Sequence, residues 1–157
     1  MNSTDWEKIY FDNPPVAPLG IIALPGSQTI AAAINRRLIE QRRKFVENNP
    51  EHAAVHGLLR DSFIISSDCP RFETGEGKAV IRETVRGYDV YIIADVGNYH
   101  CTFTMYGMEC PMSPDDHFQD IKRVISAIGG RARRITVIMP LLYEGRQHRR
   151  QSRESLD

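Results

Sequence analysis

Arginine side chains are concentrated near the end of the sequence. Arg146, Arg149, Arg150 and Arg153 fall within eight residues, and Gln147 stands beside the first of them. Guanidinium groups bind phosphate oxygens as two-pronged donors, so a segment of this kind could grip a polyphosphate. Charge runs are more often merely solvated, and composition alone favours that interpretation. No aromatic residue interleaves with these arginines, which argues against a nucleic-acid partner.

A glycine-bearing polar loop, RFETGEG at residues 71–77, is the second candidate for chemistry. Its phenylalanine, Phe72, could stack on a nucleotide base, and the carboxylate of Glu76 could accept a hydrogen bond from that base. The simpler alternative is a hairpin loop whose phenylalanine packs on the domain. The residues of the loop, taken alone, favour this simpler interpretation.

Residue types that bind metals gather between positions 100 and 117. They are His100, Cys101, Cys110, Asp115, Asp116 and His117. Their spacing matches no zinc pattern, because such sites use close pairs such as C-x2-C. We therefore expect no metal site in this segment. The two aspartates are better explained as first-turn residues of a helix, where they suit the positive end of the helix dipole.

The composition is that of an ordinary globular domain. The chain has 157 residues, of which 41% are hydrophobic and 25% charged, and its formal net charge is zero. This length predicts one domain, and the zero net charge argues against bulk nucleic acid or an anionic membrane as a partner. The sequence has no long apolar run, no secretory signal and only three cysteines. We therefore expect a reduced, cytoplasmic protein.

Apolar runs and turn residues divide the chain into strands and helices. Strands are predicted over residues 21–24, 63–67, 79–85, 89–95 and 134–140. One helix is predicted over 27–45 with Ser27 as its N-cap, and another over 113–128 with Ser113 as its N-cap. The apolar stripe of the second helix is expected at Phe118, Ile121, Ile125 and Ile128. Buried strands between helices predict an α/β domain with a mainly parallel sheet.

Two segments are less regular. Residues 51–59 could form a short helix, and residues 98–114 are expected to be a long loop or an insertion. In open α/β sheets, ligands bind beyond the carboxyl ends of the strands. The segment that starts at Arg146 lies just past the last predicted strand, so it falls at the ligand-binding edge.

Two long stretches match motifs of a known family. One reads PRFETGEGKAVIRETVRGYDVYII, and the other reads RITVIMPLLYEGRQHRRQSR. They resemble, in turn, the motifs G-R-F-S-D-G-E-x-x-V-x-I-x-E-x-V-R-G-x-D-V-x-I-I and R-I-T-A-V-I-P-Y-F-x-Y-A-R-Q-D-R-R-x-x-x-R of the ribose-phosphate pyrophosphokinases. The opening GIIALPGSQTIAAAINRRL and the helix DDHFQDIKRVISAIGG occupy the corresponding places of that family. Order and spacing agree over most of residues 20–153.

The resemblance implies a fold and an activity. These enzymes transfer the β,γ-diphosphate of ATP to the 1-hydroxyl of ribose 5-phosphate with Mg²⁺, which makes phosphoribosyl pyrophosphate for nucleotide biosynthesis. They have two phosphoribosyltransferase-like α/β domains, each a three-layer sandwich around a mainly parallel sheet. ATP lies between the domains and is partly held by a neighbouring subunit, so the resemblance also implies a homo-oligomer.

Residue roles follow from the matching positions. Phe72 would stack on adenine, with Thr74 and Glu76 beside it. The remaining ATP contacts would come from Arg146 and Gln147, and from Arg149, Arg150 and Arg153 on a flexible loop that covers the triphosphate. Thr74 departs from the acidic or amide residue of the family, and His148 replaces an aspartate. Segments 46–62 and 98–114 also look longer than their counterparts.

Three elements of the family have no counterpart before Asp157. They are the ribose-phosphate loop, a metal-holding histidine and the catalytic hairpin. We therefore expect an N-terminal half that is inactive alone and carries no catalytic residue, made of an irregular arm (1–19), a domain (20–145) and the start of the flexible loop (146–157). The apolar surface that a C-terminal domain would cover should associate with a copy of itself. Two alternatives stay open: a non-catalytic regulatory homologue, and an unrelated α/β nucleotide- or anion-binding module.

Overall fold

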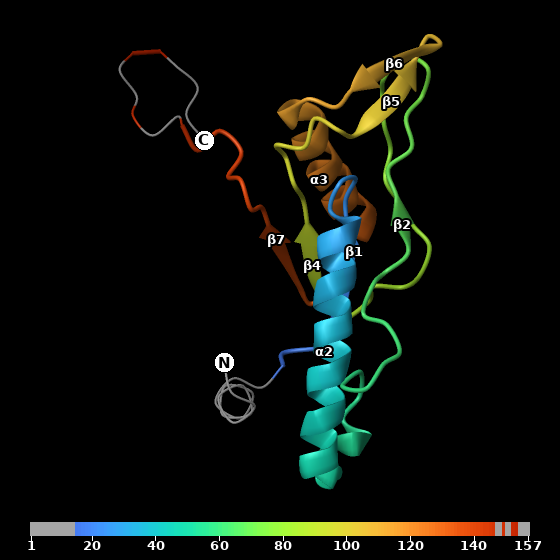
Figure 1. The fold of residues 1–157 in the computed structure, drawn as a ribbon, viewed down its shortest axis with the longest axis vertical. Coiled ribbons are helices and arrows are strands. Elements are labelled where there is room, and N and C mark those ends of the chain that lie inside the picture. Colours follow the sequence, from blue (N-terminus) through green and yellow to red (C-terminus); the bar gives the residue numbers. More distant parts are fainter. Residues whose placement is uncertain (1–14, 147–148, 150–151, 154–157) are drawn as a thin grey trace.

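A parallel three-stranded sheet forms the centre of the computed structural model, which describes residues 15–146, 149 and 152–153. Its strands are β1 (Leu19–Ala23), β4 (Asp89–Ile93) and β7 (Arg134–Ile138), in the order β1-β4-β7 (Figure 1). Ile21 pairs with Tyr91, which in turn pairs with Thr136. The expected α/β class with a parallel sheet is therefore confirmed.

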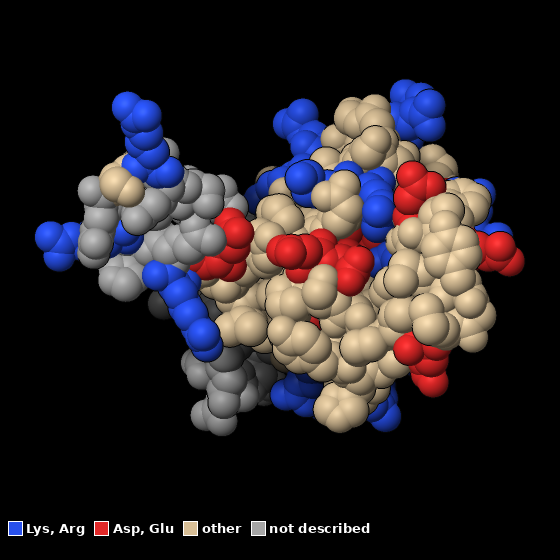
Figure 2. Space-filling view, turned by 90° about the horizontal axis from the view of Figure 1, so that it is seen from above, with Lys and Arg blue, Asp and Glu red and all other residues tan. Residues whose placement is uncertain are grey.

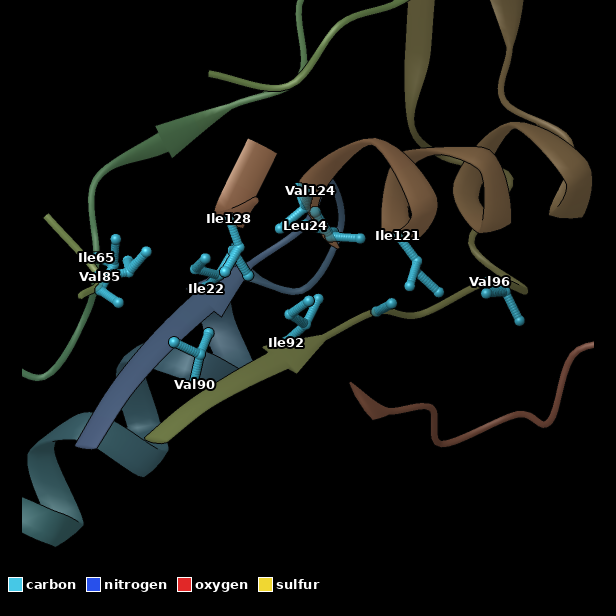
Figure 3. Packing of buried hydrophobic residues seen from close by; sticks show 11 residues of the cluster. Ile22, Leu24, Ile65, Val85, Val90, Ile92, Val96, Ile121, Val124 and Ile128 are labelled. Carbon is cyan, nitrogen blue, oxygen red and sulfur yellow. The ribbon is translucent and has the colours of Figure 1, made fainter. Parts of the chain in front are cut away.

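Two long helices cover the two faces of this sheet. α2 (Gln28–Asn48) packs on the face that carries Ile21 and Ile93, and α3 (Pro114–Ile128) packs on the face that carries Ile22 and Ile92 (Figure 3). Neighbouring strand residues point to opposite faces, so an unbroken apolar run serves both helices. The result is the three-layer sandwich that the sequence predicts.

The ends of α3 follow the local sequence. Ser113 accepts a hydrogen bond from the backbone N–H of Asp116, and the Asp116 carboxylate accepts one from the backbone N–H of Ser113. This reciprocal capping box satisfies two amides that the helix cannot pair. Gly129 ends the helix with φ of 59°, a left-handed conformation that favours glycine. The apolar stripe is shifted from its expected position, because Val124 is buried whereas Ile125 is exposed.

Ser27 precedes α2 as predicted, but its side chain does not cap the helix. The hydroxyl is fully buried and accepts a hydrogen bond from the backbone N–H of Asp95 at 2.9 Å. Asp95 follows β4, so this contact joins the loop after β1 to the loop after β4. The expected N-cap is therefore a tie between two loops at the carboxyl edge of the sheet.

Strand β7 is an edge strand, and the expectation that it is buried was wrong. None of its five residues is buried, and Ile138 is 40% exposed. Within the described residues, β4 is its only neighbour in the sheet. An apolar run therefore predicted the strand correctly but not its burial.

The other elements differ in extent from their predictions. The stretches expected at 63–67 and 79–85 contain β2 (Ser67–Asp68) and β3 (Val80–Ile81), which pair antiparallel beside α3. In the first stretch, Ile64 also makes an isolated parallel bridge to Ile21 of β1. Segment 98–114 contains an antiparallel hairpin, β5 (Thr102–Met105) and β6 (Met108–Pro111), which stands beyond the first turn of α3 (Figure 1). Segment 51–59 forms only the 3-10 turn η1 (Pro50–Ala54).

Among the described residues, no helix combines the length and apolarity needed to cross a membrane.

We predict that Ser27→Ala destabilises the protein by about 1–3 kcal/mol, because it leaves the Asp95 amide without an acceptor. Urea unfolding of the variant and the parent measures this difference. Thr29→Ala is the matched control, since Thr29 lies exposed in the first turn of the same helix. Equal and small effects of the two substitutions would contradict the prediction.

Candidate functional site

The loop that carries Phe72 is a tight hairpin. Its backbone is closed by hydrogen bonds from the Phe72 N–H to the Glu76 carbonyl at 2.7 Å and from the Gly75 N–H to the Phe72 carbonyl at 2.9 Å. Arg71 and Gly77 form an antiparallel bridge at its base. Gly75 has φ of 87°, which a side chain would strain. These contacts fix the path of the loop.

The β5–β6 hairpin holds the tip of this loop from the other side. The backbone N–H of Tyr106 donates to the carbonyl of Glu73 at 3.1 Å. A Cβ on Gly75 would lie 3.1 Å from the sulfur of Met105, so the two hairpins are in close contact. The segment that the sequence marked as a loop or insertion therefore supports the loop that carries Phe72.

Phe72 projects from this fixed loop into solvent. It is 52% exposed, so it does not pack into the domain as the simpler interpretation of the loop expected. The ammonium of Lys78 lies 5.9 Å from the ring centroid. Beside it, the Thr74 hydroxyl donates to the Glu76 carboxylate at 3.0 Å. Three of the predicted site residues, Phe72, Thr74 and Glu76, therefore share one exposed loop.

A buried ion cluster anchors the base of the loop to α3. Both terminal nitrogens of Arg71 donate to the carboxylate of Asp120, at 2.7 and 2.8 Å, and Arg123 Nη1 donates to the same carboxylate at 2.8 Å. The Arg71 side chain is 6% exposed, and that of Asp120 is fully buried. Burial works to lower the pKa of Arg71, but the hydrogen bonds to Asp120 outweigh it and raise that pKa, so the guanidinium stays charged.

Sequence reasoning missed this cluster, although one signal was present. The buried positions of α3 include His117, Ile121, Val124 and Ile128, and Asp120 lies on the same face at helical spacing. A carboxylate on a buried face requires a cationic partner. The sequence does not reveal which arginine provides it, because Arg71 is 49 residues away.

The segment after β7 is held against the start of α3. The Tyr143 ring stacks on Phe118 with centroids 4.1 Å apart and planes 9° apart, and its hydroxyl donates to Asp115 Oδ1 at 2.5 Å. This contact directs the chain that leads to Arg146.

Arg146, Arg149 and Arg153 are exposed, and basic side chains stand out from the surface at this end of the chain (Figure 2). Gln147, His148 and Arg150 lie outside the described residues, as do residues 1–14 of the expected arm.

The structure does not bring the two predicted groups of site residues together. The loop of Phe72 and the segment of Arg146 lie on opposite sides of α3 (Figure 1). A single copy of this domain therefore presents two separate surfaces rather than one enclosed pocket.

A model of the N-terminal domain of ribose phosphate pyrophosphokinase matches residues 19–157. The chain belongs to this family. A search of curated proteins found no significant match. The matched residues include both the loop of Phe72 and the segment of Arg146.

Three of the residues of metal-ligand type in segment 100–117 are engaged in other contacts. His117 Nε2 lies 2.8 Å from the Asn98 carbonyl, and Asp115 and Asp116 bind Tyr143 and Ser113. Over the described part of the chain, no three histidine, cysteine or acidic side chains converge as metal ligands would.

We predict that Asp120→Leu destabilises the domain by about 3–5 kcal/mol, because it leaves the buried Arg71 guanidinium without its counter-charge. The double variant Arg71→Met with Asp120→Leu should recover most of this loss, since it replaces the buried pair with apolar side chains. Chemical unfolding of the three proteins tests both statements. A double variant less stable than Asp120→Leu alone would contradict this account of the cluster.

Cys69 next to this cluster provides a test in alkaline solution. Burial, reinforced by the charge of Asp120, raises the pKa of the Cys69 thiol from 9.0 to about 11. The folded protein therefore holds this proton more tightly than the unfolded chain, so the stabilisation is present below pH 9 and is lost as pH rises towards 11. Between these values, the free energy of unfolding should fall more in the parent than in Cys69→Ala. Parallel declines in the two proteins would refute the assignment.

Proposed function

We propose that this domain provides the ATP-contacting surfaces of a ribose-phosphate pyrophosphokinase, with Phe72 stacking on adenine. The observation that carries the proposal is the half-exposed ring of Phe72 on a loop whose backbone is fixed at both base and tip. Such a ring offers a flat apolar face and loses little conformational freedom when a base stacks on it. Glu76, on the same loop, is placed to accept a hydrogen bond from the base.

The arginine segment serves the phosphates in this proposal. Arg146, Arg149 and Arg153 are exposed, and Gln147 and Arg150 stand between them in the sequence. Guanidinium forks match phosphate oxygens, and a segment that closes over the triphosphate stabilises charge as the diphosphate moves to the 1-hydroxyl of ribose 5-phosphate. Transfer of this kind depends mainly on positioning and on cations, with Mg²⁺ carried on the phosphates of ATP. The role of this chain is to bind and orient ATP.

The separation of the two surfaces supports an oligomeric enzyme. A Phe72 loop and an arginine segment on opposite sides of α3 could meet at one ATP molecule if each came from a different copy. Ile138, Leu141 and Leu142 are exposed at and beyond the edge strand, which provides apolar surface for a further domain or a second copy.

A second candidate is a non-catalytic regulatory member of the same family. Thr74 favours it, because its hydroxyl already engages the Glu76 carboxylate that would otherwise accept from adenine. Production of phosphoribosyl pyrophosphate by this domain joined to a second domain would separate the two candidates. An unrelated binding module is excluded, because the chain belongs to the pyrophosphokinase family.

We predict that Phe72→Ala weakens ATP binding by about five- to a hundredfold, the range expected for loss of one base-stacking ring. Phe72→Tyr keeps the ring and should bind ATP as the parent does. Tyr99→Ala removes another exposed ring, outside the proposed site, and serves as the control. Calorimetric titration with ATP and Mg²⁺ measures all four proteins. Equal affinities of Phe72→Ala and the parent would rule out the proposed role of the loop.

A further inference from the structure

A basic groove lies between the end of the Phe72 loop and the outer face of α3. It is open to solvent and has a volume of about 430 Å³. Three cationic side chains line it, Lys78, Lys122 and Arg123, together with the polar side chains of Gln119 and Ser126. No carboxylate is among its lining residues. Neither Phe72 nor Arg146 lines it, but Lys78 lies beside the Phe72 ring, so the groove adjoins the Phe72 surface.

Arg123 is held in a defined position at this groove. Its Nη1 donates to the buried Asp120 carboxylate, and its side chain is only 22% exposed. Gly77 makes this possible, since a Cβ there would lie 2.7 Å from Arg123 Nη1 and 2.4 Å from Arg71 Nη1. A guanidinium fixed in this way has already lost the side-chain freedom that binding an anion would otherwise cost.

Arg123 keeps unused hydrogen-bond donors at the groove although it is paired with Asp120. Arg71 holds the Asp120 carboxylate with two hydrogen bonds, and Asp116 adds further negative charge near Arg71. The carboxylates of Asp120 and Asp116 therefore lie beside the two arginines. Of the donors on Arg123, Nη1 is engaged, whereas Nε and Nη2 have no acceptor among the described residues. These donors remain available to a ligand.

The two lysines add charge without acidic partners. The ammonium of Lys122 lies 5.6 Å from the centroid of the Phe118 ring, and that of Lys78 lies 5.9 Å from the Phe72 ring. In the described part of the chain, neither ammonium has a carboxylate within ion-pair distance. Contact with an aromatic face attracts a cation but does not neutralise it.

We propose that this groove binds a small molecule that carries a phosphate group. Three cations with no lining carboxylate favour an anion, and a guanidinium beside ammonium groups suits the oxygens of a phosphate. The volume is in the range of small-molecule sites. Gln119 and Ser126 offer neutral hydrogen bonds to the uncharged part of a phosphate ester.

The test is titration of the 157-residue chain with inorganic phosphate and, separately, with ribose 5-phosphate. NMR chemical shifts of α3 amides provide the readout, and a preference for the ester over free phosphate distinguishes the two sources of the ligand. We expect saturable shifts at Gln119, Lys122 and Ser126. The double variant Lys78→Gln with Lys122→Gln should raise the dissociation constant about tenfold, because two partly exposed charge contacts are lost.

Two controls separate this site from general charge effects and from the ATP surfaces. Lys44→Gln removes an exposed lysine from α2, on the other side of the sheet, and should leave the dissociation constant unchanged. Arg146→Ala should weaken ATP binding but not the shifts on α3. The proposal is overturned if α3 shows no saturable shift up to about 10 mM ligand, or if Lys44→Gln weakens binding as much as the double variant does.

Discussion

The buried carboxylate of Asp120 is the constraint on which the site depends. A charge removed from water must be paired, and Asp120 is paired by Arg71 from the loop and by Arg123 from its own helix. The pairing joins the base of the Phe72 loop to the middle of α3. The same interaction therefore fixes the direction of Phe72 and the position of Arg123 in the basic groove.

Around this cluster, the domain is assembled from supports that come from distant parts of the chain. The β5–β6 hairpin contacts the tip of the Phe72 loop, and Tyr143 binds α3 by stacking on Phe118 and by donating a hydrogen bond to Asp115. Both supports converge on α3, which itself packs on the central sheet. A rigid helix thus holds two exposed surfaces at a constant separation.

The strands of the central sheet differ in how deeply they are buried. β4 lies in the centre of the sheet and is mostly buried. β7 forms an edge of the sheet, has no buried residue, and continues into a segment with exposed Leu141 and Leu142. An open sheet edge with apolar side chains next to it is a surface against which another strand, domain or subunit can pack. The basic groove lies away from this edge, on the outer face of α3, so a partner at the edge and a ligand in the groove would not compete.

The sequence by itself determined the α/β class, the three central strands, the capped α3 and the family, because each depends on local periodicity, a cap motif or a linear motif. Only the tertiary structure decided the partner of Asp120, the use of Ser27 as a tie to Asp95, and the exposure of β7. It also revealed a hairpin where the residues suggested a loop. The physical reason is distance along the chain: periodicity shows which face of an element is buried, whereas hydrogen bonds between remote segments follow from packing that no local pattern records.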